Sequence, residues 1–325
     1  MKLFGKQKIL RSVFRAVVLL PLAFSEQAFA VTFTPYATYV LPPSIDNMAI
    51  LYNFSTYANT YVTPSGTSEN NTRVSNNVSL LRYFRSFSVA GMPGAFQYFQ
   101  PYVGWLGNQR IGGETLPSHN GFGQPTLNLN IWPYVNENTG TTVVLGVNLS
   151  PPVSSYNSRY TLNPGAPPAW SEGILVGGHT TLFGNARTRN LVLEALSLTT
   201  FYQNSDTFLA STPRGPMSAV YHEKTSQELD FFLTYTFAPA KLSSVSVGYS
   251  KTFGGSQTIT IPGLAQLGVS STVDTGNRTD ESTLILSANT FVTRSVFLSA
   301  YGYSDLSARG GTKNRTLGVA AGFMF

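Results

Sequence analysis

The three histidines, His119, His179 and His222, are the first side chains to consider for metal or acid–base chemistry. They lie far apart in the sequence and lack the H-x-x-x-H or H-E-x-x-H spacing that is typical of zinc sites. The chain has no cysteine, which excludes thiolate metal ligands, disulfides and cysteine nucleophiles. We therefore expect no metal site and no cofactor.

A hydrolase would need a nucleophile beside a histidine. His179 stands in an expected strand next to Thr180 and Thr181, and a Ser, His and Asn or Asp from neighbouring strands can converge there, because geometry rather than spacing defines a triad. The sequence contains no Gly-x-Ser-x-Gly elbow. We expect no enzyme and no catalytic residue. A hydrolase or deacylase of outer-membrane lipid remains an alternative, which a Ser or Thr beside His179 on the lipid-facing rim would indicate.

Polar residues at alternate positions of the expected strands are stronger functional candidates. On the inner face of a barrel, such residues line a water path or pair across it. Their alternative role is structural, because arginine–carboxylate pairs can also fill a lumen. The candidates for the lumen and solute path are Arg82, Asn128, Asn130, Glu194, Glu228 and Asp230. Arg85 has the opposite parity to Arg82, which predicts that one of the two lies at an interface or on a bulge.

The elements that position these residues are strands with period-two alternation, separated by Gly, Asn, Pro and Ser clusters. The clearest pair, 229–237 and 245–253, flanks the short connection 238–241 and predicts a hairpin. We expect about twelve strands, near 47–58, 76–88, 95–106, 124–135, 142–151, 172–183, 190–203, 226–237, 243–254, 281–292, 295–304 and 314–325.

The connections between these strands alternate in length. The short ones include 89–94, 136–141, 184–189, 238–242 and 293–294, and the long ones are 59–75, 107–123, 152–171, 204–225 and 255–280. Short periplasmic turns and long outer loops are typical of outer-membrane barrels. No stretch past the N-terminal segment has the roughly 18 apolar residues of a transmembrane helix.

Closure of this sheet follows from the cost of unpaired backbone groups in hydrocarbon, which excludes an open sheet edge. We therefore predict an all-β fold: a transmembrane antiparallel up-and-down β-barrel of about 12 strands over residues 46–325. The last strand ends the chain on Phe325, which suits an interfacial aromatic girdle and recognition by the barrel-assembly machinery. Other aromatics near expected strand ends are assigned to the same girdles, among them Tyr57, Tyr61, Phe96, Tyr98, Phe99, Trp105, Trp132, Tyr134, Phe201 and Tyr202.

The N-terminal segment 1–30 has the pattern of a cleavable signal peptide: Lys and Arg first, then an apolar run, then Ala28-Phe29-Ala30. It holds five of the 21 Lys and Arg and one of the 15 Asp and Glu, which leaves a formal charge of +2 on the remainder. No basic stripe remains, so we expect no nucleic-acid partner. Segment 31–45 contains three prolines and is expected to be a periplasmic lead-in or a plug.

Two short motifs carry a resemblance to a known family. Leu41-Pro42-Pro43 precedes the strand that begins Met48-Ala49-Ile50, and Gly121-Phe122-Gly123-Gln124-Pro125 precedes the strand from Leu127 to Trp132. With the C-terminal strand, these motifs resemble the outer-membrane transporter family of the MetA-pathway of phenol degradation. That family usually has Gly-x-Gly-Asp at the second motif, where this chain has Gln124. The resemblance implies a barrel that passes small, often aromatic, molecules.

We expect a barrel of the cell outer membrane that passes a small, aromatic or hydrophobic, solute by passive diffusion. Eight-strand barrels are filled by side chains and 16- to 18-strand porins hold open channels, so twelve strands predict a narrow, selective lumen. The expected partners are outer-membrane lipid, the solute and the barrel-assembly machinery. A sealed structural or adhesion barrel is a further alternative, in which inward charges would be fully paired across the axis.

Overall fold

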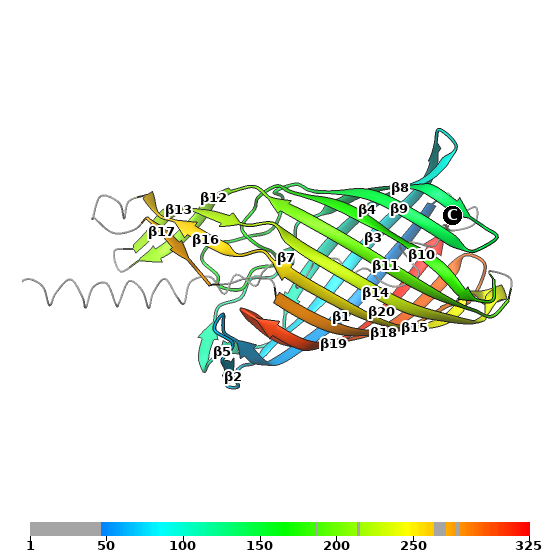
Figure 1. Ribbon diagram of the computed structural model, residues 1–325. Helices are drawn as coiled ribbons and strands as arrows, with labels where there is room; N and C mark the ends of the chain where they lie inside the picture. Colours follow the sequence, from blue (N-terminus) through cyan, green and yellow to red (C-terminus); the bar gives the residue numbers. More distant parts are fainter. Residues whose placement is uncertain (1–46, 186–187, 213–214, 263–270, 277–279) are drawn as a thin grey trace, which may run out of the picture.

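The fold is a closed barrel of twelve antiparallel strands, seen in a computed structural model that describes residues 47–185, 188–212, 215–262, 271–276 and 280–325 (Figure 1). β1 pairs with β3 on one side and with the C-terminal β20 on the other, which closes the sheet. The twelve strands are β1 (Asn47–Val62), β3 (Val74–Val89), β4 (Met92–Trp105), β8 (Thr126–Asn136), β9 (Thr141–Ser150), β10 (Ser171–Phe183), β11 (Asn190–Tyr202), β14 (Ser226–Ala238), β15 (Ser243–Gly254), β18 (Asp280–Phe291), β19 (Val296–Arg309) and β20 (Gly311–Met324).

Each of these strands coincides with one of the twelve predicted ranges, so the predicted fold class is confirmed. Several strands run further at one end than predicted; β1 reaches Val62 and β19 reaches Arg309. The expected signal peptide and the lead-in or plug segment lie outside the described residues. No helix of the described part of the chain is long and apolar enough to cross a membrane.

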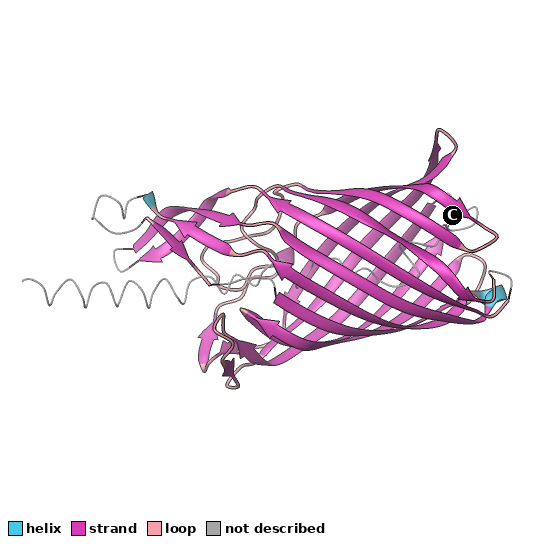
Figure 2. Ribbon diagram, viewed as in Figure 1, coloured by secondary structure: helices cyan, strands magenta, loops and turns pink. Residues whose placement is uncertain are grey.

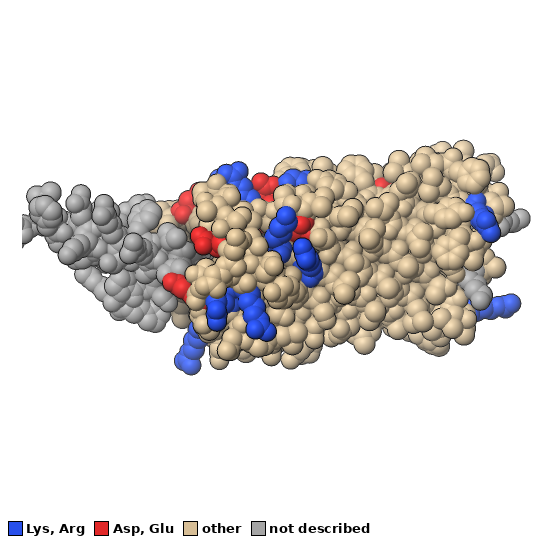
Figure 3. Space-filling model, turned by 90° about the horizontal axis from the view of Figure 1, so that it is seen from below, with Lys and Arg blue, Asp and Glu red and all other residues tan. Residues whose placement is uncertain are grey.

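Side chains alternate between a buried inner face and an exposed outer face, as period-two sequences require. On β9, for example, Val143, Leu145, Val147 and Leu149 are exposed, whereas Thr142 and Val144 are buried. On the face seen in Figure 3, Lys, Arg, Asp and Glu gather toward one end, a few Lys or Arg side chains lie at the other end, and the wall between them is mostly uncharged. An apolar outer wall on a closed barrel is the surface that hydrocarbon requires.

The two ends of the barrel differ in their connections. Short turns, among them residues 90–91 and 137–140, lie at the end that carries the C-terminus, and the long connections lie at the other end (Figures 1 and 2). By the usual asymmetry of such barrels, the C-terminal end is periplasmic and the other end is the outer mouth. The connection between β19 and β20 is the exception at the outer mouth, because Gly310 alone joins the two strands.

A second sheet projects from the outer mouth, built from two connections that were predicted to be loops. β12 (Ser205–Thr212), β13 (Gly215–Glu223), β16 (Gln257–Thr260) and β17 (Thr272–Asp274) form it. The loop prediction was wrong there, since Phe208, Tyr221 and Ile259 form an apolar cluster that a free loop could not bury. Tyr156 packs against this cluster, and its burial raises the pKa of Tyr156 to about 12.

Further short strands lie along the barrel rim and between the long strands. β2 (Ser68–Glu69) pairs with β1, and β7 (Gly121–Phe122) pairs with β4. A hairpin of β5 (Gln109–Ile111) and β6 (Glu114–Leu116) packs with Trp105 and Leu162 in an apolar cluster. These elements add buried surface at the outer mouth.

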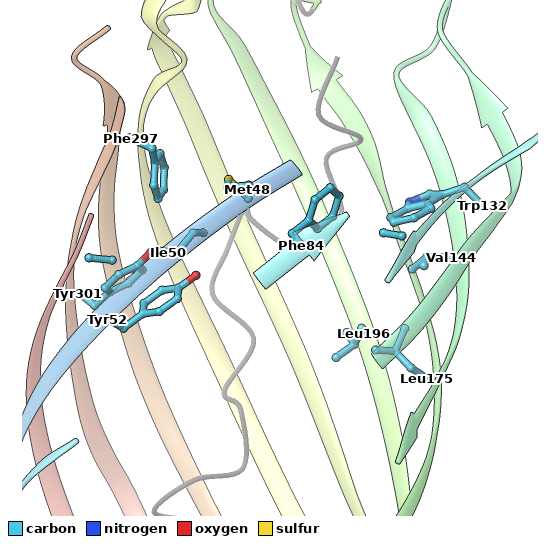
Figure 4. Packing of buried hydrophobic residues seen from close by; sticks show 12 residues of the cluster. Met48, Ile50, Tyr52, Phe84, Trp132, Val144, Leu175, Leu196, Phe297 and Tyr301 are labelled. Carbon is cyan, nitrogen blue, oxygen red and sulfur yellow. The ribbon is translucent and has the colours of Figure 1, made fainter. Parts of the chain in front are cut away.

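Apolar side chains also form a belt around the inside of the barrel (Figure 4). Ile50, Tyr52 and Tyr301 contribute from one part of the wall, and Trp132 and Leu196 contribute from another. The girdle assignment is therefore wrong for Trp132, and also for Tyr61, Phe99 and Trp105, which are all buried. A position near a strand end does not by itself separate girdle aromatics from inward ones. The odd or even place of the residue along its strand does, because it fixes the face of the sheet on which the side chain lies.

Candidate functional site: the inner wall

All six residues predicted to line the lumen face the inside of the barrel, because they share the parity of the buried positions on their strands. None has more than 5% of its surface exposed. They divide into two groups by strand: Arg82, Asn128 and Asn130 lie on β3 and β8, and Glu194, Glu228 and Asp230 lie on the adjacent β11 and β14. Arg85 points outward at the periplasmic end, as its opposite parity predicted.

Arg82 is held by neutral groups on both neighbouring strands. Its Nε donates to Gln97 Oε1 at 2.8 Å, a second guanidinium nitrogen donates to the same oxygen, and Nη1 donates to Tyr52 Oη at 3.2 Å. The guanidinium also lies over the Phe99 ring, 5.3 Å from its centroid. These two acceptors and the ring hold the planar guanidinium group of Arg82 in one orientation.

An amide ladder continues from this arginine around the wall. Gln97 Nε2 donates to Asn128 Oδ1 at 2.8 Å, and Asn128 Nδ2 lies 3.1 Å from Asn130 Oδ1 and 2.5 Å from Asn148 Oδ1. The register explains the ladder, since Gln97 is opposite Asn128 and Asn128 is opposite Asn148. The two asparagines predicted as site residues thus belong to one polar network with Arg82.

Four carboxylates gather on the other side of the lumen, near the outer mouth. We call Glu228, Asp230, Glu281 and Asp305 the acidic cluster; they lie on β14, β18 and β19. Glu281 is within electrostatic range of both Asp305 and Glu228, and Glu228 is within range of Asp230. Only the first two residues of this cluster were predicted.

The members of the acidic cluster differ in their hydrogen-bond partners. Asp305 accepts from Thr283 Oγ1 at 2.9 Å and from the backbone N–H of Asn314 at 2.5 Å. Asp230 is 0% exposed; Ser250 and Glu228 lie near its carboxylate, but neither oxygen has a partner at full hydrogen-bond geometry among the described residues. Asp230 is thus the member of the acidic cluster with the most free acceptor capacity.

Arg82 and Asp230 lie on opposite walls. In the circuit of twelve strands, β3 and β14 are six strands apart in either direction. A fixed positive charge facing fixed negative charges sets up an electric field across the lumen, which acts on any charged or dipolar solute between them.

An aromatic group lies between these two walls. Tyr52 and Phe54 on β1 and Tyr301 and Tyr303 on β19 have ring centroids 5.8 to 6.3 Å apart in successive pairs. Tyr52 receives the hydrogen bond from Arg82, and Tyr303 is within electrostatic range of Asp230. The group therefore extends from the arginine toward the acidic cluster.

The three histidines contact different residues and form no common site among the described residues. His179 Nδ1 lies 3.0 Å from Thr142 Oγ1, His119 stacks on Tyr160, and His222 Nδ1 lies 2.6 Å from Asn204 Oδ1. No group of three His, Cys, Asp or Glu residues suited to a metal ion occurs in the part of the chain that the structure describes. Thr142 does supply a hydroxyl beside His179, but both side chains lie on the inner wall rather than on the lipid-facing rim.

Gln124, where the resembled family has an acid, has a structural role. Its Nε2 donates to the backbone carbonyls of Ser150 and Ala169, at 2.9 and 2.6 Å, and so ties the end of β9 to the connection before β10. A carboxylate has no donor for these two acceptors. In the same motif a Cβ at Gly123 would come within 2.9 Å of the Pro164 carbonyl, so glycine permits this close approach.

Two solved structures share this fold over nearly the whole chain. A COG4313 outer membrane channel from Pseudomonas putida F1 is 18% identical, with 90% of this chain and 100% of that chain covered and a TM-score of 0.72. The transport unit of the autotransporter AIDA-I from Escherichia coli is 7% identical, with coverages of 91% and 94% and a TM-score of 0.50. No protein-family model and no curated protein sequence matches the chain. The comparisons thus establish the fold class, an outer-membrane β-barrel.

Sequence reasoning missed Gln97, Glu281, Tyr303 and Asp305. Parity could have found them, because Asp305 has the same parity as the inward Tyr301. Asp305 was overlooked because the predicted strand ended at residue 304, whereas β19 extends to Arg309.

Proposed function

We propose that this protein is an outer-membrane channel for passive passage of a small solute with an aromatic or hydrophobic part, without a cofactor or an energy source. The observation that carries the proposal is the charge arrangement of the inner wall, with Arg82 opposite Asp230 in a closed barrel. Membership of the phenol-degradation transporter family, and an export signal in residues 1–30, belong to the same proposal.

A sealed structural barrel would be expected to pair its inward charges. Asp230 forms no ion pair with any of the described residues. A buried carboxylate without a cationic partner is costly in a filler but useful along a solute path. This difference favours the channel.

The lipid-hydrolase alternative needs its histidine where lipid can reach it. His179 and Thr142 lie on the inner wall, away from the lipid-facing surface. A hydrolase of membrane lipid would have to draw its substrate into the lumen, so this alternative is less favoured.

The test is single-channel conductance of the purified protein in planar bilayers, with and without small aromatic solutes. We expect discrete conductance steps that these solutes reduce, and Asp230→Asn should alter the solute effect. Glu172→Gln is the matched control, because Glu172 is an exposed carboxylate on the outer face of β10. A demonstrably folded barrel without conductance would contradict the proposal and would favour the sealed barrel or, if His179→Ala abolished lipid hydrolysis, the enzyme.

A further inference from the structure

The acidic cluster lies just inside the outer mouth. Glu228 and Asp230 are the third and fifth residues of β14, which starts at that end, and Glu281 is the second residue of β18. Its burial increases inward: Glu281 is partly exposed, Asp305 and Glu228 are 6% and 5% exposed, and Asp230 is 0% exposed. The cluster thus forms a graded series of negative groups that leads from the outer mouth into the lumen.

No basic side chain of the described residues pairs with the inner end of this series. Asp230 has two buried carboxylate oxygens with no donor at full hydrogen-bond geometry among the described residues. Ser250, which is opposite Asp230 on β15, and Thr283, opposite Ser250 on β18, add small hydroxyl groups to the same wall. The Lys251–Asp280 ion pair at 2.5 Å lies at the rim, where both side chains are about one-third exposed, and does not reach Asp230. A donor that carries positive charge would complete this wall.

The chemistry of the surroundings favours an organic cation over a metal ion. Metal ions need several ligands in close, defined geometry, and the described residues contain no such group. An ammonium group instead combines charge-assisted hydrogen bonds to carboxylates with attraction to aromatic faces. Tyr303 lies within electrostatic range of Asp230, and its ring stacks with Tyr301 at 6.3 Å.

We infer that the acidic cluster, together with Tyr303, binds the ammonium group of a small organic amine as it passes through the lumen. The apolar part of that amine would lie against the rings of Tyr301 and Phe54, which continue the aromatic surface. Arg82 on the opposite wall repels a cation and so directs it toward the carboxylates. This inference deepens the proposed function and rests on it, because it names the solute class of the same lumen.

Equilibrium binding tests the inference without requiring conductance. Benzylammonium is titrated by calorimetry into the full-length exported protein in detergent, beside its neutral isostere benzyl alcohol, the anion benzoate, and calcium. We expect benzylammonium to bind at least tenfold more tightly than benzyl alcohol and benzoate, and Asp230→Asn to weaken it by about tenfold or more. Glu172→Gln should leave binding unchanged.

The outcomes separate the inference from the proposed function. Conductance with equal binding of benzylammonium and benzyl alcohol would overturn the inference and leave the channel intact. Selective ammonium binding without conductance would support the inference while contradicting the channel. Tight calcium binding in place of ammonium binding would overturn the choice of an organic cation. If Asp230→Asn does not fold, two measurements still decide the question: the binding of benzylammonium against benzyl alcohol by the wild type, and the binding of benzylammonium by the Asp305→Asn variant.

Discussion

The ring of Phe54 lies over Gly318, its partner in the β1–β20 pair, so that a Cβ added at residue 318 would overlap the ring. Tyr301, opposite Gly318 on β19, packs 6.0 Å from Phe54. Since Gly318 has no side chain, rings from β1 and β19 meet across the strand between them. This glycine therefore makes the aromatic group of the lumen possible.

Gly318→Val should destabilise the barrel by roughly 1–3 kcal/mol, because the added methyl groups force the Phe54 ring out of its position. The measurement is urea unfolding in lipid vesicles followed by tryptophan fluorescence. Gly302→Val is the matched control, since a Cβ at Gly302 meets nothing closer than 3.9 Å. The double variant Gly318→Val, Phe54→Ala should recover part of the loss. Equal stabilities for the two glycine variants would contradict the prediction.

Arg82→Met should raise the preference of the channel for cations over anions, because it removes the positive charge that faces the acidic cluster. Arg82→Lys keeps the charge and should change the preference much less, although both variants leave Gln97 Oε1 poorly paired and should cost roughly 1–3 kcal/mol of stability. Reversal potentials in a salt gradient measure the effect. Arg85→Met is the control, because Arg85 is exposed on the outer wall. The idea fails if Arg82→Met and Arg85→Met give the same reversal potential.

Leu145→Arg should destabilise the membrane-inserted barrel by roughly 2–4 kcal/mol, the cost of an arginine near the bilayer midplane. Leu145 is 40% exposed in the middle of β9, where an outward side chain contacts lipid. Val153→Arg, in the connection after β9, should have little effect because Val153 is already 66% exposed outside the strands. Unfolding in bilayers measures both; a small loss for Leu145→Arg would argue against lipid at this wall.

Deletion of Phe325 should reduce the yield of folded barrel in the outer membrane. The backbone N–H of Phe325 donates to the Asn47 carbonyl at 3.1 Å, and its ring stacks on Phe323 at 6.1 Å, so the last residue secures the seam with β1. The heat-dependent mobility of the protein on gels measures the folded fraction. Phe325→Tyr should assemble normally, and a normal yield from the deletion would show that the terminal aromatic is dispensable.

The barrel could be predicted from the sequence because each wall strand has one apolar face, and period-two alternation is readable residue by residue. The hairpin of β14 and β15, for example, shows Phe231 and Val247 outward and Asp230 and Ser250 inward. The sheet at the outer mouth could not be predicted in this way. Its apolar cluster combines β12, β13 and β16 with Tyr156 from a third connection, so no single segment shows the pattern.

The site was predicted in part for the same physical reason. Parity placed Arg82 and Asp230 on the inner face correctly, since a strand position fixes its side of the sheet. The partners of these residues depend on register between strands that are distant in sequence, such as Gln97 opposite Asn128. Register between non-neighbouring segments leaves no local trace, so the amide ladder and the aromatic group emerge only from the fold.

The pairing of β1 with β20 also has a consequence for biogenesis. Met48 is opposite Met324, so the contact that completes the wall joins the first and last strands of the barrel. Such a contact has a large sequence separation and a correspondingly large loop-closure entropy, which slows folding. Until β20 arrives, β1 presents a full-length row of unpaired amides and carbonyls that could pair with another chain. A nascent or truncated copy of this protein is therefore a potential source of aggregation, and safe folding depends on keeping the edge of β1 that faces β20 free of other chains until β20 has arrived.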